Sequence, residues 1–405
     1  MTEVQIREIA GGITAPAGFR AAGVACGIKA SGATDLALIA CEEPGTAAGV
    51  FTTNLAQAAP VVTSRDHLKR SGGRAAAIVV NSGCANACTG ADGIAHARAM
   101  VDLTASGVGC QSLNVLVAST GVIGVKLEMS KVARGIADAT RQLSASGGSA
   151  AARAIMTTDP FPKESAVEIS SRQGTFRVGG IAKGSGMIEP LMATMLGFVT
   201  TDVAVEPSVL QRALNTVVND TFNAITVDGE CSTNDCVFTI ASGASGVRLE
   251  EEDFPLLVSA LRAACEPLAI GIVRGGEGAT KLITVTVGGA RSDADAKRTA
   301  RAIANSPLVK TAIHGGDPNW GRLIAAAGRS GADFDLDRAS VTIGAVRLFE
   351  SGVPHDERAD EAATVLAAKT IDIAVDLGTG GAHEATMWTC DFSAEYVKIN
   401  AEYRT

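Results

Sequence analysis

The chain has 405 residues, of which 46% are hydrophobic and 19% are charged, and it contains 45 glycines. This composition predicts a large buried core of small side chains with many tight turns, and the length allows two or three domains. The net charge of −8 argues against a nucleic-acid partner, because nucleic-acid-binding proteins present clustered Lys and Arg residues.

The cysteines and the N-terminal sequence indicate the compartment. None of the nine cysteines forms a Cys-x-x-Cys pair, and neither Cys84 with Cys88 nor Cys231 with Cys236 has a histidine beside it. This pattern favours apolar packing over a disulfide framework or a metal site, and it is typical of a reducing cytoplasm. The first residues lack the apolar stretch of a signal peptide. No apolar run is expected to reach the roughly 18 residues of a membrane-spanning helix.

Strand-like runs rich in Val, Ile and Ala alternate with helical stretches along the whole chain. These runs predict strands at 35–41, 75–81, 113–119, 164–170, 175–181, 237–241, 281–287, 340–346, 371–377 and 384–391. Helices are predicted to begin near Ser130, Pro207 and Ser292, where a capping residue or a first-turn Pro precedes apolar residues at helical spacing. An amphipathic helix is predicted at 357–370. Strands and helices do not alternate strictly, so the fold class is mixed α and β.

Ala193 and Thr194 lie between two methionines in the Gly-rich segment 183–198. A Thr hydroxyl is a weak nucleophile unless a base removes its proton, and an N-terminal Thr can use its own α-amine. Self-cleavage would create that terminus. The Thr194 hydroxyl would attack the Ala193 carbonyl, and water would then release the fragment that begins with Thr194. The alternative is a buried strand with core methionines.

Two further segments could serve acyl transfer. Thr120 and Gly121 follow a predicted strand and could present a hydroxyl and a backbone N–H to a developing oxyanion, or could simply form a turn. Lys183 precedes Gly-Ser-Gly, where glycines allow a substrate carboxylate to approach closely. The alternative for Lys183 is a solvated side chain.

The second half of the chain has three polar loops. Glu277 in RGGEGATK could pair with an ammonium group, although loop glutamates are usually solvated. The loop at 226–235 lacks the register of a calcium loop, so a turn near the active site is the better interpretation. His314 in HGGDPNWGR lacks a Ser or Cys motif to act with, which favours a loop that is structural or that supports the site residues from behind.

Together these motifs resemble the ornithine acetyltransferase family, whose members are glutamate N-acetyltransferases and amino-acid acetyltransferases. The matches span almost the whole chain in the expected order. They are NSG-x-ANACTG at 81–90, STGVIG at 119–124, the TTD of 157–159 with Lys163, the nucleophile segment, VDG-x-x-STND, GEGATK, DPNWGR and the C-terminal NAEY. Four positions depart from the pattern: Cys84 and Leu191 replace Asn, Pro160 replaces Thr, and Gly275 replaces Asp. These departures affect the expected substrate preference and leave the predicted chemistry intact.

The resemblance implies a layered α-β-β-α fold that cleaves itself between Ala193 and Thr194. The products would be an α fragment, 1–193, and a β fragment, 194–405. Two fragments of each kind are expected to form a heterotetramer in the cytoplasm.

The resemblance also implies a reaction and a site. The enzyme would move the acetyl group of N2-acetylornithine to glutamate through an acetyl-Thr194 ester, as a step of arginine biosynthesis. Thr120 and Gly121 would form the oxyanion hole. Substrate contacts are expected from Thr157, Thr158, Lys183, Thr194, Glu277, Asn400 and Thr405. Acetyl-CoA is the candidate second donor, and no other cofactor and no metal are expected.

Three alternatives remain open from the sequence. An N-terminal-nucleophile amidase or aminopeptidase would use water as the acceptor. A monofunctional transferase would not use acetyl-CoA, and no residue decides this. A non-catalytic relative would have lost Thr194 or the Thr120-Gly121 pair, and both are present.

Overall fold

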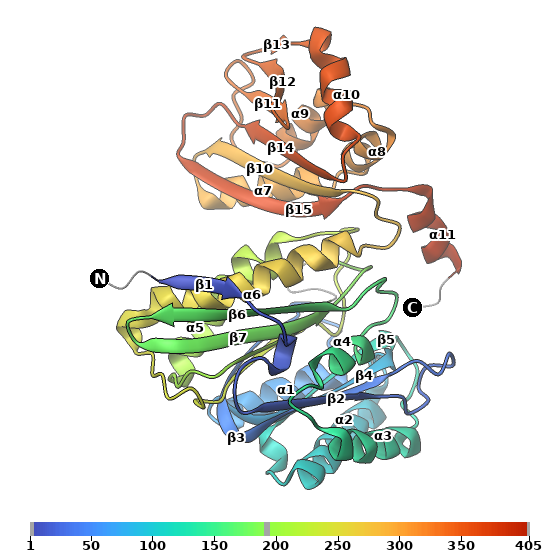
Figure 1. The fold of residues 1–405 in the computed structure, drawn as a ribbon. Helices are drawn as coiled ribbons and strands as arrows, with labels where there is room; N and C mark the ends of the chain where they lie inside the picture. Colours follow the sequence, from blue (N-terminus) through green and yellow to red (C-terminus); the bar gives the residue numbers. More distant parts are fainter. Residues whose placement is uncertain (1–3, 190–194, 403–405) are drawn as a thin grey trace. The chain divides into compact units, whose positions relative to one another are not determined.

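The computed structural model describes residues 4–189 and 195–402, and these divide into two compact units (Figure 1). The first unit comprises Met1–Asn223 and Glu230–Ile272, and the second comprises Ala224–Gly229 and Val273–Tyr403. The predicted fragments 1–193 and 194–405 do not coincide with these units, because their boundary falls inside the first one.

One curved sheet organises the first unit. Over the described residues its strand order is β1 (Gln5–Glu8), β6 (Lys163–Ser171), β7 (Gly174–Lys183), β8 (Leu196–Thr201), β9 (Cys236–Ala241), β3 (Leu36–Phe51), β4 (Arg74–Cys84) and β5 (Val115–Val122), with β2 (Phe19–Val24) also paired to β3. The pairs β4–β5 and β8–β9 are parallel, and the others are antiparallel. Strand β3 is long enough to pair with β2 and β4 through its first half and with β9 through its second half.

Helices pack against both faces of this sheet. They are α1 (Ala59–Arg70), α2 (Gly90–Val108), α3 (Met129–Gln142), α4 (Gly148–Ala154), α5 (Pro207–Asp220) and α6 (Phe254–Arg274). Val79 of β4 enters a core that α2 and α3 cover, whereas its neighbour Ile78 enters a second core that also contains Phe198 of β8. The second core therefore joins the two halves of the folded sheet. On the opposite face of β7, Gly180 lies against Leu268 of α6. The predicted mixed α/β class and its α-β-β-α layering are confirmed within this unit.

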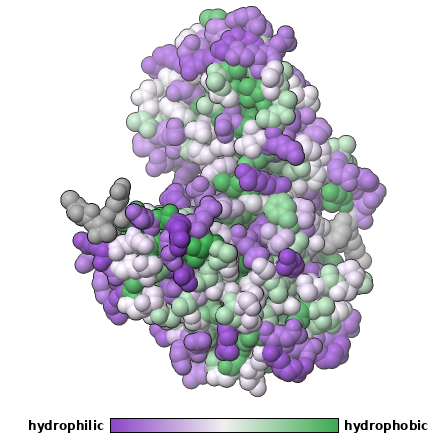
Figure 2. Space-filling view, viewed as in Figure 1, coloured by the Kyte–Doolittle hydropathy of each residue, from purple (hydrophilic) through white to green (hydrophobic). Residues whose placement is uncertain are grey.

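The second unit has its own sheet and core. Its strand order is β13 (Val353–Pro354), β12 (Val346–Glu350), β11 (Ser340–Ile343), β14 (Thr370–Asp376), β10 (Leu282–Ala290) and β15 (His383–Cys390). Its helices are α7 (Asp293–Ala304), α8 (Pro307–Gly315), α9 (Trp320–Gly328), α10 (Ala359–Leu366) and α11 (Ala394–Glu402). Alternate residues of β14 are buried, so one face of this sheet packs on the core. Hydrophilic residues cover much of the face around β12, β13 and α10 in Figure 2.

Several predicted elements form as expected. Pro207 opens α5, and the Ser292 hydroxyl caps α7 by accepting from the Asp295 backbone N–H at 3.1 Å. Short 3₁₀ helices complete the described chain at Gly12–Thr14, Ser112–Asn114, Phe222–Ala224, Glu251–Asp253 and Asp356–Arg358.

Three local predictions were wrong. Glu128, not Ser130, occupies the N-cap of α3, which begins at Met129. The strand predicted at 340–346 is a hairpin of β11 and β12, because Gly344 turns the chain with a φ of +58°. The helix predicted at 357–370 is shorter, since α10 ends at Leu366 and the following residues enter β14.

The expectation about membrane-spanning length was also wrong. Glu251–Arg274 is long and apolar enough to cross a bilayer by length and composition, with a mean hydropathy of 1.8 over an 18-residue window. Half of that stretch is buried within the protein, and Arg262 of α6 pairs with Asp220 of α5 at 2.7 Å. Because α6 packs against β7 and carries this ion pair, we interpret it as a core helix of the first unit.

Candidate active site

The predicted nucleophile lies outside the described residues, as do Ala193, Leu191 and Thr405. The described residues before and after it are the ends of two neighbouring strands. Strand β7 ends at Lys183, and β8 begins at Leu196. These two strands are paired neighbours in the centre of the first sheet, with Lys183 opposite Leu196. The site can therefore be built from the residues around the ends of these strands.

Thr120 and Gly121 lie at the end of β5, where its parallel pairing with β4 becomes irregular. Gly121 has a φ of +128°, and a Cβ there would lie 2.3 Å from the carbonyl carbon of Gly83, so only glycine fits. The ammonium of Lys183, which is buried, donates to the Thr120 hydroxyl oxygen at 3.2 Å. The fold thus brings two predicted site residues together although they are 63 positions apart in sequence.

A network of buried amides holds the backbone before Thr120. The Ser119 hydroxyl donates to the Asn81 side chain at 2.6 Å, and the Asn81 amide donates to the Cys84 carbonyl at 2.8 Å. Asn234 donates to the carbonyls of Ser119 at 2.9 Å and Ala85 at 2.6 Å. The loop at 226–235 therefore reaches the end of β5 through Asn234, which agrees with its interpretation as a turn near the active site.

Asp159 is a buried carboxylate that receives three donors. Lys163 approaches at 2.6 Å, the Gly184 backbone N–H at 2.7 Å and the Thr157 backbone N–H at 2.9 Å. Burial alone would raise the pKa of Asp159, but the Lys183 and Lys163 ammonium groups and these hydrogen bonds lower it to about 2. Asp159 therefore stays ionised at neutral pH and ties the 157–159 loop to the residue after Lys183.

Lys29 adds a third ammonium group around Asp159. It donates to the carbonyls of Thr34 at 2.8 Å and Met156 at 2.7 Å. Burial lowers its pKa, although Asp35 and Asp159 oppose that shift. No pattern in the sequence marks Lys29, because a Lys before a Ser-Gly turn normally points into solvent. With Asp35 beside Lys29, the three lysines face two buried aspartates, which leaves one excess positive charge that suits a carboxylate ligand.

The remaining described site residues lie in two places. The Thr158 hydroxyl lies 2.6 Å from the hydroxyl of Ser185 in the first unit. In the second unit the Asn400 amide donates to the Glu277 carboxylate at 2.9 Å, and Glu277 is only 9% exposed. Two predicted substrate residues that are 123 positions apart are thus in direct contact.

Three of the four positions that depart from the family pattern lie in the described residues. Cys84 is buried and its thiol donates to the Val125 carbonyl at 3.2 Å, whereas Pro160 is exposed and Gly275 is buried. In the described residues no group of three or more His, Cys, Asp or Glu side chains is arranged to hold a metal ion. The acidic groups of the first-unit site accept from lysines and backbone N–H groups.

Comparisons with known proteins point to one family. The model of the ArgJ family matches residues 20–405. The arginine biosynthesis bifunctional protein ArgJ of Symbiobacterium thermophilum is 49% identical over 404 residues, which cover 98% of this chain and 99% of that protein. Its namesake from Synechococcus sp. is 48% identical over the full length of both chains. A crystal structure of arginine biosynthesis bifunctional protein ArgJ from Bacillus halodurans is 44% identical with a TM-score of 0.50, and all of that chain is matched by 52% of this one.

Proposed function

The chain belongs to the ArgJ family, and from this premise we propose that it is an acetyltransferase of arginine biosynthesis that uses Thr194 as nucleophile. The proposed donor is N2-acetylornithine and the proposed acceptor is glutamate. The observation that supports the chemistry most directly is the buried contact between the Lys183 ammonium and the Thr120 hydroxyl. Lys183 is the last residue of β7 and lies 11 positions before Thr194 in the sequence.

The first proposed step is self-cleavage. The Thr194 hydroxyl attacks the Ala193 carbonyl, and the C–N bond breaks as an ester forms, which frees the Thr194 amine. Water then hydrolyses the ester, which releases the Ala193 carboxylate and restores the Thr194 hydroxyl. The solved Bacillus halodurans chain supports this step, because 52% of the present chain matches all of it. Residues 194–405 make up the same share of the sequence. A chain of that size is expected where the full-length product has been cut in two.

The second proposed step is acetyl transfer to Thr194. The freed α-amine has an ordinary pKa of about 7.7–8.0, so it can accept the hydroxyl proton as the oxygen attacks the acetyl carbonyl. Because the Thr120 oxygen accepts a hydrogen bond from Lys183, its own O–H is available to the developing oxyanion, beside the Gly121 N–H. Ornithine leaves with the proton, and an acetyl ester remains.

The third step transfers the acetyl group to glutamate. The glutamate amine attacks the ester, the same oxyanion hole stabilises the second tetrahedral intermediate, and N-acetylglutamate leaves as Thr194 recovers its proton. The lysine-rich surroundings of Asp159, with Thr157 and Thr158, would hold substrate carboxylates. Glu277 and Asn400, with Thr405, would hold the substrate ammonium. Acetyl-CoA as a second donor and an assembly of two α and two β fragments complete the proposal.

Intact mass and acetyl transfer together test the proposal. The freshly purified wild-type chain should give two fragments under denaturing conditions, the second beginning at Thr194, and should form N-acetylglutamate from N-acetylornithine and glutamate. Thr194→Ala should remain a single chain of 41.1 kDa without transfer activity. Thr175→Ala is the matched control, because Thr175 is an exposed threonine at the start of β7.

Two results would reject this function. A cleaved and active Thr194→Ala variant would remove Thr194 from both steps. Release of free acetate without dependence on glutamate would identify an amidase that uses water instead. A cleaved wild-type chain that forms N-acetylglutamate at a rate proportional to glutamate occupancy supports the proposed transferase.

A further inference from the structure

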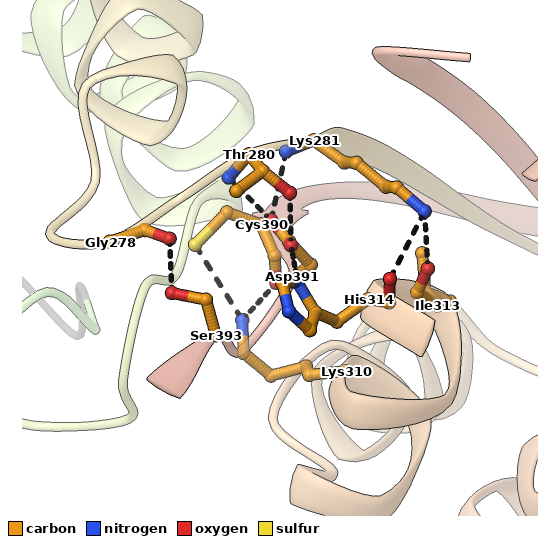
Figure 3. Close-up of polar contacts among 9 residues, drawn as sticks. All are labelled: Gly278, Thr280, Lys281, Lys310, Ile313, His314, Cys390, Asp391 and Ser393. Atoms are coloured by element: carbon orange, nitrogen blue, oxygen red, sulfur yellow. Dashed lines mark hydrogen bonds and ion pairs between the residues drawn. The ribbon is translucent and has the colours of Figure 1, made fainter. Parts of the chain in front are cut away.

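Asp391, directly after β15, is a buried carboxylate with an unusual number of donors. Its side chain is fully buried, and it accepts from the Thr280 hydroxyl at 2.6 Å, the Thr280 and Lys281 backbone N–H groups at 2.8 Å, and His314 Nδ1 at 2.7 Å (Figure 3). Burial alone would raise the pKa of Asp391, but the hydrogen bonds from Thr280 and His314 outweigh it and lower the pKa. Because an ionised carboxylate only accepts, His314 must donate to it.

Helix α8 is tied to the same strand end by a second contact. The Lys310 ammonium is buried and donates to the Thr389 hydroxyl at 2.7 Å and to the Cys390 carbonyl, and it lies 4.7 Å from the Phe392 ring centroid. Burial lowers the pKa of Lys310. We refer to Thr280, Lys310, His314 and Asp391 as the Asp391 cluster. It joins three segments: the start of β10, the end of α8 and the end of β15.

The Asp391 cluster adjoins the two segments that carry the proposed substrate residues Glu277 and Asn400. Thr280 is three positions after Glu277 in the same loop. On the other side, the Ser393 hydroxyl donates to the Gly278 carbonyl at 2.6 Å, as Figure 3 shows. Gly278 has a φ of +68°, and a Cβ there would lie 2.4 Å from the Tyr396 backbone nitrogen in α11. The loop that carries Glu277 therefore packs closely on the first turn of α11, the helix that carries Asn400.

We propose that the Asp391 cluster positions Glu277 and Asn400 for the substrate ammonium. This inference rests on the proposed function, since it assumes that Glu277 binds the side-chain ammonium of N-acetylornithine. Thr280, His314 and Asp391 are positioning residues that act through Glu277. The Asp391 carboxylate holds the backbone of the loop after Glu277, and Ser393 holds that loop to the start of α11. The Asn400–Glu277 hydrogen bond, at 2.9 Å, then joins the two substrate residues directly.

A carboxylate is required at position 391 because all four groups around it donate. An amide at this position would turn one NH₂ group toward donors and leave them unsatisfied inside the protein. A mildly perturbing test therefore changes a donor rather than Asp391. Thr280→Val removes the hydroxyl and keeps the backbone N–H, and Thr280→Ser restores the hydroxyl. Thr286→Val is the matched control, because Thr286 lies on β10, the strand that follows Thr280, and its hydroxyl contacts β15 through Thr386 at 3.2 Å.

The first readout is the KM for N-acetylornithine in the acetyl-transfer assay. Thr280→Val should raise this KM roughly tenfold, the effect expected from losing one hydrogen bond to a charged group. Thr280→Ser and Thr286→Val should stay near the wild-type value. In a Glu277→Gln background, Thr280→Val should add little, because the residue through which it acts is already changed. A full additional tenfold rise in that background would overturn the proposal.

The second readout is amide hydrogen exchange, which does not depend on activity. Thr280→Val should increase exchange across 276–279 and the α11 residues 394–402, whereas Thr286→Val should leave both segments at the wild-type rate. Unchanged exchange in Thr280→Val would overturn the positioning role even if the KM for N-acetylornithine rose. A wild-type chain without transfer activity would reject the proposed function, while the exchange result would still decide whether the cluster holds these two segments.

Discussion

The buried pair of Asp159 and Lys163 gives the sharpest quantitative prediction. Their side chains are 0% and 2% exposed, and the carboxylate–ammonium distance is 2.6 Å. We predict that Asp159→Asn lowers the free energy of unfolding of the first unit by about 3 kcal/mol, because it leaves the Lys163 ammonium buried beside a neutral group. The same change should weaken acetyl transfer, since Asp159 also holds the Gly184 N–H next to Lys183.

The magnitude follows from the environment of Asp159. Its pKa falls from 3.8 to about 2, which corresponds to on the order of 2 kcal/mol in favour of the ionised form in the folded protein. Removing one partner of a buried ion pair typically costs roughly 3–5 kcal/mol, because the other charge remains in a poorly solvated place. The asparagine oxygen can still accept one of the donors, so the lower end of that range is expected.

Unfolding should be followed in the Thr194→Ala background, where the proposal predicts an uncut chain. Cleaved fragments would otherwise dissociate on unfolding and make the transition depend on protein concentration. Trp320 and Trp388, the two tryptophans of the chain, both belong to the second unit, so their fluorescence follows that unit in urea. Far-UV circular dichroism includes the first unit. Asp159→Asn should move the circular dichroism transition more than the fluorescence transition if the units unfold separately.

A double-mutant cycle tests the electrostatic reasoning. Lys163→Met alone should also destabilise the first unit, whereas Asp159→Asn with Lys163→Met should cost less than the sum of the single changes by about 2 kcal/mol. Asp202→Asn is the matched control, because buried Asp202 accepts from the backbone N–H groups of Arg177 at 2.8 Å and Ala17 at 3.0 Å. Strictly additive single effects would refute the claim that the two charges stabilise each other.

Three further predictions concern acid, the oxyanion hole and the fragments. The folded pKa of Asp159 lies below its unfolded value, so its contribution to stability, about 2 kcal/mol, is complete above roughly pH 4 and is lost toward pH 2. In Asp159→Asn the free energy of unfolding should therefore fall less steeply with pH between pH 4 and pH 2 than in the wild type. Gly121→Ala should lower kcat at least about a hundredfold. Gly124→Ala is the control for backbone strain, because Gly124 also has a positive φ, of +80°, but its added Cβ meets nothing within 4 Å; it should keep transfer activity. The cleaved fragments should co-elute in native gel filtration and separate only in denaturant.

The sequence predicts elements well where one local signal decides them. Pro207 opens α5 and Ser292 caps α7, because both act on their own helix turn. Gly344 splits β11 from β12 through a positive φ that no hydrophobic pattern shows. Helix α2 was not predicted, since its Gly- and Ala-rich sequence lacks a clear apolar stripe.

The site was predicted only through its motifs. The sequence identifies Thr120 and Lys183 as candidates, but their 3.2 Å contact depends on the pairing of strands that are distant in the chain. Lys29 and Asp391 were missed because burial decides their roles, and a single charged residue in a loop carries no local sign of burial. Asp391 becomes conspicuous only when donors from β10 and α8 converge on it.

The position of the proposed cut explains why the fold would survive it. Strand β7 belongs to the predicted α fragment, while β8 and β9 belong to the β fragment, and β3 belongs to the α fragment again. The order β7–β8–β9–β3 in one sheet means that the α fragment pairs with the β fragment on both edges of the β8–β9 pair. All residues of β8 and β9 are buried. The proposed cut lies between the end of β7 at Lys183 and the start of β8 at Leu196, so both strands stay intact, and separation of the fragments would require breaking two strand pairings in the core.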